Sequence, residues 1–250
     1  MAKQEADQFD RLGALYEDMA TWPFRKWIET PSVKRAVGDV DSLDVVDFGC
    51  GSGFYSRLLK AAGANRVLGY DLAEGMLGYA RNTARIENVE IEFRSALTPS
   101  DRGAFDLVLA VYVLPYATSR AELASMCADM MAPLRSGGRL VALPIHPNFD
   151  PEPAYYQACG FTLTPDRPDR PHQDGGRLLL DLRYRQHIAS VHAWYWSAES
   201  IESALRSAGA ESVEWTLPGL DDRVDVSQVP AELQAYLDRP HAAIVECVKA

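Results

Sequence analysis

The feature that most constrains the fold is a repeated alternation of short apolar runs and amphipathic stretches between residues 43 and 147. The run at 105–114 (FDLVLAVYVL) is almost wholly apolar, as in a strand covered on both faces. The clearest amphipathic stretch, residues 123–134, follows a capping box formed by Ser119 and Glu122. Strands that alternate with helices are joined by right-handed crossovers and form a mostly parallel sheet. We therefore predict an α/β domain.

The alternation stops after residue 147. Residues 147–176 are rich in Pro, Asp and Arg and are predicted to form an inserted loop, followed by an antiparallel hairpin. The first forty residues carry apolar side chains at helical spacing. We predict one domain over 1–250, made of a helical N-terminal cover (1–40), a ligand-binding core (41–147), a lid insert (148–196) and the C-terminal part of the sheet (197–250).

Composition excludes several classes of function. The chain has 25 basic and 35 acidic side chains and a net charge of −10, which disfavours a nucleic acid held by its phosphates. The four cysteines are far apart and form no metal-ligand or disulfide pattern, as expected in a reducing cytoplasm. The sequence shows no apolar run as long as a membrane span and no signal peptide, so we expect a cytoplasmic protein whose partner is a small molecule, with no metal, membrane or nucleic acid.

A glycine-rich turn, Gly49-Cys50-Gly51-Ser52-Gly53, joins the first buried strand to the following helix. Glycines at such a turn let a ligand approach the backbone closely. Asp71 ends the next strand, where its carboxylate can accept hydrogen bonds from both hydroxyls of a ribose. The acidic Asp47 and the bulky Phe54 disfavour a pyrophosphate at this turn. Together they indicate a nucleoside cofactor that carries an ammonium and a carboxylate.

This pattern resembles the class I S-adenosylmethionine-dependent methyltransferases, through the segments VVDFGCGSGFYS, RVLGYDLAEGMLGYAR, FDLVLAVYVLPYA and LRSGGRLVALPIHP. The resemblance implies a Rossmann-like fold with a mostly parallel seven-stranded sheet and helices on both faces. It also implies S-adenosylmethionine as methyl donor and S-adenosylhomocysteine as product. Through FDRLGALYEDM and HAWYWSAESIESALRSAGAESVEWTLP the chain looks most similar to the toxoflavin synthase type, which methylates ring nitrogens of an azapteridine.

The resemblance assigns the glycines to the methionine part of the cofactor, Asp71 to the ribose, and Leu72 and Met76 to the adenine. Many relatives carry an Asp after the third strand, whereas this chain has Ser95 and Ala96 there. Tyr16 is expected to close over the cofactor carboxylate. The expected cofactor-binding residues are Tyr16, Asp47, Gly49, Cys50, Gly51, Gly53, Asp71, Leu72, Met76, Ser95 and Ala96.

The acceptor is expected beyond the carboxyl ends of the strands, where ligands bind in open α/β sheets. Aromatic walls suit a flat, weakly polar acceptor. Strand alternation places His192, Trp194 and Trp196 on one face of the hairpin and Ala193 and Tyr195 on the other, and leaves open which face lines the pocket. The expected substrate-binding residues are Tyr112, Tyr116, His146, Trp194, Tyr195 and Trp196, and the candidate catalytic residues are Tyr112, His146 and His192.

We expect metal-independent methylation of a small aromatic or heterocyclic acceptor, most specifically of a ring nitrogen, in secondary metabolism such as antibiotic biosynthesis. O-methylation of a phenol or hydroxyl is the alternative. A ring nitrogen with a free lone pair needs no base, whereas a phenol or an alcohol gains from one. An aminopropyl transfer, a cyclisation and a non-catalytic binding protein stay open, because a fold does not fix chemistry.

Overall fold

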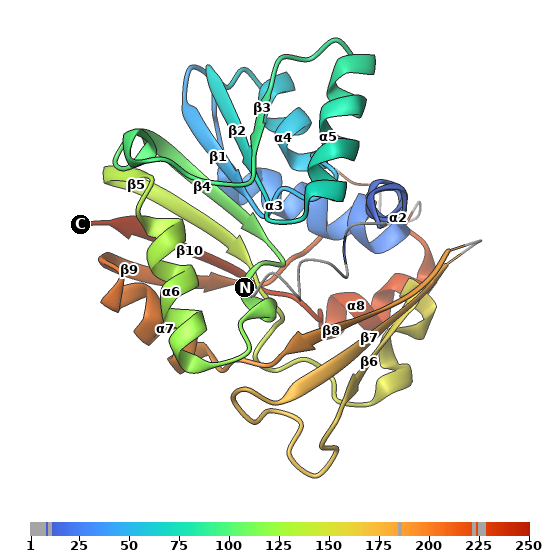
Figure 1. Cartoon of the computed structure of the whole chain (residues 1–250). Coiled ribbons are helices and arrows are strands. Elements are labelled where there is room, and N and C mark those ends of the chain that lie inside the picture. Colours follow the sequence, from blue (N-terminus) through green and yellow to red (C-terminus); the bar gives the residue numbers. More distant parts are fainter. Residues whose placement is uncertain (1–8, 10–11, 185–186, 222–223, 225–228) are drawn as a thin grey trace.

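A computed structural model describes residues 9, 12–184, 187–221, 224 and 229–250. At its centre lies a seven-stranded sheet in the order β3-β2-β1-β4-β5-β10-β9 (Figure 1). Only β10 runs antiparallel to its two neighbours in this sheet of the described chain. The strands are β1 (Asp44–Phe48), β2 (Arg66–Tyr70), β3 (Glu92–Arg94), β4 (Phe105–Val111), β5 (Leu134–Leu143), β9 (Ala210–Thr216) and β10 (Ile244–Lys249). The predicted α/β fold with a mostly parallel seven-stranded sheet is confirmed.

Helices cover both faces of this sheet because neighbouring strand residues point to opposite sides. Val45 of β1 packs in the cluster under α3 (Thr30–Val37) and α4 (Phe54–Ala61). Val46 packs in the cluster under α6 (Arg120–Met131) and α7 (Ala198–Ser207). The helix α5 (Glu74–Ile86) packs its Leu77 and Ala80 against Phe93 of the edge strand β3. Among the described residues, no helix is long and apolar enough to cross a bilayer.

A second sheet, β6-β7-β8, lies beyond the carboxyl ends of the parallel strands (Figure 1). The strands β7 (Arg177–Tyr184) and β8 (His187–Trp194) form the predicted antiparallel hairpin. The strand β6 (Phe161–Pro165) was not predicted and corrects the expected loop over 147–176. Its Phe161, Leu163 and Pro165 are buried and its two threonines are half-buried, so it behaves as an ordinary alternating strand inside a segment rich in Pro and Asp.

Two further segments pack on the inner side of this second sheet. One is the N-terminal segment with α2 (Gly13–Met19) and a π-helical turn at Arg25–Glu29, and its predicted range 1–40 is described except for 1–8 and 10–11. The other is the connection between β9 and β10, which carries the unpredicted helix α8 (Gln234–Asp238). Trp22, Phe24 and Tyr236 are fully buried in the shared apolar cluster. We call these segments and the second sheet the cover.

Candidate active site

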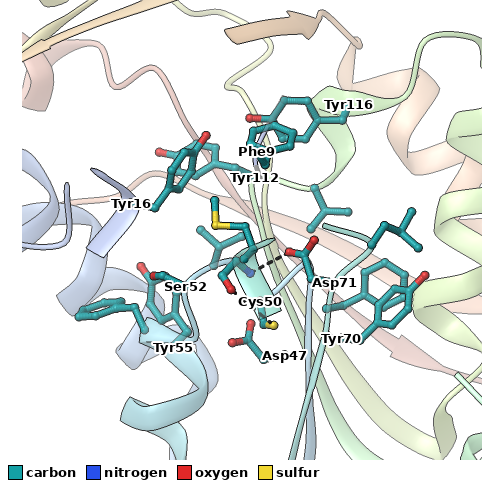
Figure 2. A pocket seen from close by; sticks show the side chains of 18 of the residues that line it. Phe9, Tyr16, Asp47, Cys50, Ser52, Tyr55, Tyr70, Asp71, Tyr112 and Tyr116 are labelled. Atoms are coloured by element: carbon teal, nitrogen blue, oxygen red, sulfur yellow. Dashed lines mark hydrogen bonds between the residues drawn. The ribbon is translucent and has the colours of Figure 1, made fainter. Parts of the chain in front are cut away.

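A cavity of about 380 Å³ opens at the carboxyl ends of β1, β2 and β4, under the cover. This is where the strand order changes direction, because β1 lies between β2 and β4. Figure 2 shows Asp47, Cys50 and Asp71 at one end and the rings of Phe9, Tyr16, Tyr112 and Tyr116 at the other. The cavity therefore has a polar end built on the sheet and an aromatic end built partly from the cover.

The carboxylate of Asp71 is fixed by two backbone amides. The Gly51 N–H donates to its Oδ2 at 2.8 Å (Figure 2). The Ala73 N–H donates to its Oδ1 at 2.9 Å. The Gly49 and Cys50 amides both donate to the Tyr70 carbonyl, at 2.7 and 2.9 Å. The Gly51 and Ala73 amides each bond to a different oxygen of the carboxylate and so fix its orientation. The geometry suits an acid that also accepts from the hydroxyls of a bound ribose.

The space beside Gly51 shows whether a ligand can approach the backbone of the glycine turn. Its φ is +52°, and a Cβ built on it meets no atom within 4 Å, although the residue lines the cavity. Gly53 differs, because a Cβ there would lie 3.0 Å from Ala80 and from Phe93. The open side of Gly51 is a cradle in which a ligand can contact the main chain directly. Asp47, Gly51 and Asp71 face one space and therefore fit the ammonium, the methionine chain and the ribose of S-adenosylmethionine.

Asp47 is almost fully buried beside this loop. The Ser56 hydroxyl donates to its Oδ2 at 2.6 Å. Burial raises the pKa of Asp47 to about 7, and the nearby charge of Asp71 acts in the same direction, while Ser56 opposes it. The carboxyl thus titrates near neutral pH, and its ionised form is the one that attracts an ammonium group.

A second cavity of about 40 Å³ adjoins the aromatic end and shares the walls Tyr16, Arg25, Tyr112 and Tyr116. Its other walls are apolar except for His241. They are Met19, Phe24, Pro115, Ile145, Phe161, Leu163, Leu180, Leu182 and Ala193. Tyr16 and Tyr116 are hydrogen-bonded to each other, and burial raises the pKa of Tyr16 to about 12, so both hydroxyls stay protonated at neutral pH.

Most of the expected cofactor contacts line the first cavity. They are Tyr16, Asp47, Gly49, Cys50, Gly51, Asp71, Leu72 and Met76. Gly53, Ser95 and Ala96 are not among the described residues that line this cavity. The α-carbon of Gly53 instead packs against Ala80 and Phe93, and the Ser95 side chain is hydrogen-bonded to Glu74. Ser125, Met126 and Asp129 of α6, which were not expected at the site, also line the cavity.

Only some of the residues expected to contact the acceptor line a cavity. Tyr112 and Tyr116 line both cavities, whereas His146 and the aromatic residues of the hairpin do not appear among the described residues that line either. Ala193 lines the second cavity, so the inward face of the hairpin is the one that carries Ala193 and Tyr195. Tyr195 donates its hydroxyl to the Pro147 carbonyl, and the Trp196 indole N–H donates to the Ala117 carbonyl, which makes both parts of the core.

The three candidate catalytic residues differ in position. Tyr112 lies at the junction of the cavities. His146 places its Nδ1 3.2 Å from the Pro240 carbonyl, and burial lowers its pKa. His192 is exposed on the outward face of β8. The geometry brings only Tyr112 to the cavities, and the catalytic roles of His146 and His192 stay predictions.

Sequence reasoning missed a group of buried polar residues behind Tyr112. Arg25 and Glu29 lie four residues apart on the N-terminal segment, with Arg25 Nε 3.3 Å from Glu29 Oε2. Tyr236 and His241 come from the connection between β9 and β10. The one available signal was the charged pair at i,i+4 spacing within the apolar stretch TWPFRKWIE.

Comparison with known proteins agrees with this geometry. Residues 45–138 match the family model described as a methyltransferase domain. A ubiquinone biosynthesis O-methyltransferase from Methylococcus capsulatus is 34% identical over 92 residues, 35% of this chain and 38% of that protein. The corresponding enzyme from Bordetella avium is 30% identical over 142 residues, 52% of this chain and 56% of that protein. The alignments thus span about half, or less, of the length of these curated relatives.

Solved structures extend the likeness to nearly the whole chain. An S-adenosylmethionine-dependent methyltransferase structure from Listeria monocytogenes superposes with a TM-score of 0.63 at 20% identity, over 89% of this chain and 96% of that one. At this identity the likeness establishes the fold.

We expect Gly51→Ala to weaken the binding of S-adenosylhomocysteine by more than tenfold, because the new methyl group enters the open side of the loop. Gly103→Ala is the matched control, since Gly103 also has a positive φ (+67°) and no atom within 4 Å of its Cβ position, but lies outside the cavity lining. Both variants should lose about 1–2 kcal/mol of stability from the left-handed backbone. Calorimetric titration and thermal unfolding measure the two effects, and equal loss of binding in both variants would contradict the assignment.

We expect the affinity for S-adenosylhomocysteine to rise by roughly tenfold between about pH 6 and pH 8, because Asp47 must ionise to attract the ligand ammonium. The pKa of Asp47 in the folded chain, about 7, lies above its ordinary value of 3.8. The folded state therefore holds an extra proton between about pH 4 and pH 7, so the free energy of unfolding should fall as pH rises through that range. Asp47→Asn should bind with little pH dependence, and an unchanged pH profile in this variant would contradict the assignment.

Residues 45–138 thus match a methyltransferase-domain model, and the chain has the fold of solved S-adenosylmethionine-dependent methyltransferases.

Proposed function

We propose that this chain is an S-adenosylmethionine-dependent methyltransferase that acts on a small, largely apolar aromatic acceptor. One observation carries the proposal: the Asp71 carboxylate, the open side of Gly51 and the titrating Asp47 all face a single cavity. The methyltransferase-domain match and the curated relatives support it. The charge of the polar end supports it too, because two carboxylates suit a cationic donor.

The bound cofactor supplies a methyl group on a positively charged sulfur, and the departing thioether is neutral. The chain binds and orients the cofactor. Asp71 accepts hydrogen bonds from the ribose hydroxyls, Asp47 attracts the ammonium group, and the Gly51 backbone sets how deeply the cofactor enters the cavity. At the aromatic end, the Phe9 ring packs edge-on against Tyr116 and Tyr16, with ring centroids 4.9 and 6.0 Å apart, and these rings exclude water. Positioning of this kind lowers barriers by roughly 7–11 kcal/mol in well-oriented systems.

The acceptor lies at the aromatic end, against Tyr112 and Tyr116. The second cavity, of about 40 Å³, has room for a substituent of the acceptor and is walled mainly by apolar side chains. We place a hydroxyl oxygen first as the methylated atom, because the two curated relatives described above carry the name ubiquinone biosynthesis O-methyltransferase. A ring nitrogen, expected from the likeness to the toxoflavin synthase type, is the second candidate. Secondary metabolism and a cytoplasmic location stay predictions.

We expect Asp71→Asn to weaken the binding of S-adenosylhomocysteine by about tenfold or more, because hydrogen bonds to a charged group are worth about 1.5–3 kcal/mol. Asp106→Asn is the matched control: Asp106 also accepts a strand amide, that of Asp44 at 2.8 Å, but lies outside the cavity lining. Isothermal titration measures both. Absence of binding by the unmodified chain would sink the proposed function.

We expect the chain to methylate a phenol or catechol in a panel that pairs aromatic hydroxyl compounds with nitrogen heterocycles. Mass spectrometry detects the gain of one methylene unit, and fragmentation assigns the methylated atom. A product methylated only on nitrogen would replace our first choice with the second, and a panel that stays unmodified while the donor is bound would contradict both acceptor assignments.

A further inference from the structure

Behind the wall shared by the two cavities lies a closed ring of four hydrogen-bonding side chains, Glu29, Tyr112, His241 and Tyr236. The hydroxyls of Tyr112 and Tyr236 both donate to Glu29 Oε1 in short hydrogen bonds. His241 completes the ring, with its Nε2 3.2 Å from Tyr112 Oη and its Nδ1 3.1 Å from Tyr236 Oη. The side chains of Glu29, Tyr236 and His241 are buried, and Tyr112 is half-buried.

The ring is one proton short. With Glu29 ionised and His241 neutral, it holds three protons, one on each hydroxyl and one on the imidazole, for its four contacts. One imidazole nitrogen then faces a hydroxyl oxygen whose proton points to Glu29. A fourth proton fills every contact: a protonated Glu29 donates to one tyrosine, which donates to His241, which donates to the other tyrosine, which donates back to Glu29. The ring can therefore take up one proton without moving a heavier atom.

Tyr112 connects the ring to the place where an acceptor would bind. It lines both cavities, and His241 lines the second. Tyr112 follows β4 with φ +56°, a left-handed conformation that is costly for a bulky residue. Its amide donates to the Leu143 carbonyl at 2.9 Å, which holds the residue at this position. The residue thus lines both cavities while its hydroxyl is hydrogen-bonded within the ring.

The charges around the ring decide where an added proton rests. Burial raises the pKa of Glu29, and the adjacent Arg25 opposes this effect in part. Burial lowers the pKa of His241 to about 3, with Arg25 and His146 acting in the same direction. Among the described residues, the other ionisable groups near the ring include Tyr55, Tyr156 and Cys159, and burial raises the pKa of each, so all three are neutral near pH 7. An added proton therefore rests on Glu29 rather than on His241.

We propose that this ring accepts the proton that the acceptor loses on methylation, which makes the acceptor a hydroxyl compound rather than a nitrogen with a free lone pair. The acceptor O–H breaks, and its electron pair forms the new O–C bond. Its proton passes to Tyr112 Oη as the Tyr112 proton passes to Glu29, and the electron pair of the methyl–sulfur bond stays on sulfur. One buried positive charge and one buried negative charge disappear together. This inference rests on the proposed function.

The test uses 4-nitrophenol, whose visible absorbance reports ionisation, bound to the full chain with S-adenosylhomocysteine. One pH unit below the pKa of the free phenol, about a tenth of it is ionised in solution. We expect the bound phenol to be mostly phenolate, with no net proton release when binding is measured calorimetrically in buffers of different ionisation enthalpy. Ionisation by the charge of Arg25 alone would instead release one proton per phenol bound.

Tyr112→Phe and Glu29→Gln should return the bound phenol to its un-ionised form, an approximately tenfold fall in the phenolate fraction. Tyr112→Phe keeps the Arg25–Glu29 pair and serves if Glu29→Gln does not fold. Tyr156→Phe is the control, because Tyr156 is buried in the same cluster and stacks on Phe161 but lies outside the ring. S-adenosylhomocysteine binding and thermal unfolding verify that each variant is folded.

The outcomes separate the two proposals. The inference is supported if the unmodified chain and Tyr156→Phe bind 4-nitrophenol as phenolate without releasing a proton, and if the ring variants bind it un-ionised. A phenol that is not bound, is bound un-ionised, or is bound with release of a proton overturns it, while S-adenosylhomocysteine binding leaves the proposed function standing. Failure to bind S-adenosylhomocysteine overturns the proposed function itself.

Discussion

The ligand-binding end of this molecule depends on one buried carboxylate. Glu29 is fully buried, and a buried charge is costly unless it is paired and hydrogen-bonded. Its partners come from three separate parts of the chain: Arg25 from the N-terminal segment, Tyr112 from the end of β4, and Tyr236 from the connection between β9 and β10. The cover is thereby fastened to the sheet by polar contacts with a defined geometry, and the apolar cluster of the cover packs around them.

The two ends of the cavity are built by different means. At the cofactor end, the amides of Gly51 in the glycine turn and of Ala73 at the start of α5 hold Asp71, so the geometry follows from the two strand–helix connections. At the acceptor end, side chains from α2, the π-helical turn, β6 to β8 and the segment after α8 meet. Substitutions in β6 to β8, whose side chains line only the second cavity, can therefore reshape that cavity without touching the expected cofactor contacts, which fits a fold that hosts many acceptors.

Sequence reasoning succeeded where the determining contacts are local. The strand-turn-helix at Gly49–Gly53 and the position of Asp71 follow from periodicity and turn chemistry within some thirty residues. It failed where contacts are long-range. Nothing near His241 in the sequence indicates that it meets Tyr112, 129 residues away. Alternation on β8 could not reveal that Ala193 faces inward, because that depends on where the second sheet packs. The strand β6 was not predicted, because the prolines and aspartates near it in the sequence are typical of loops.

Carboxylates and a guanidinium line different ends of the cavity, and under the proposed function this order favours one direction of binding. Asp47 and Asp71 lie at the polar end and Arg25 at the aromatic end, where its guanidinium carbon is 5.5 Å from the centroid of the Tyr112 ring. A cationic donor is drawn toward the carboxylates, and an acceptor oxygen that gains negative charge is drawn toward Arg25. The methyl group then lies between them. In the proposed reaction, Glu29 loses its charge only when a proton arrives through the ring, so Arg25 keeps a neutralising partner until the acceptor has given up its proton.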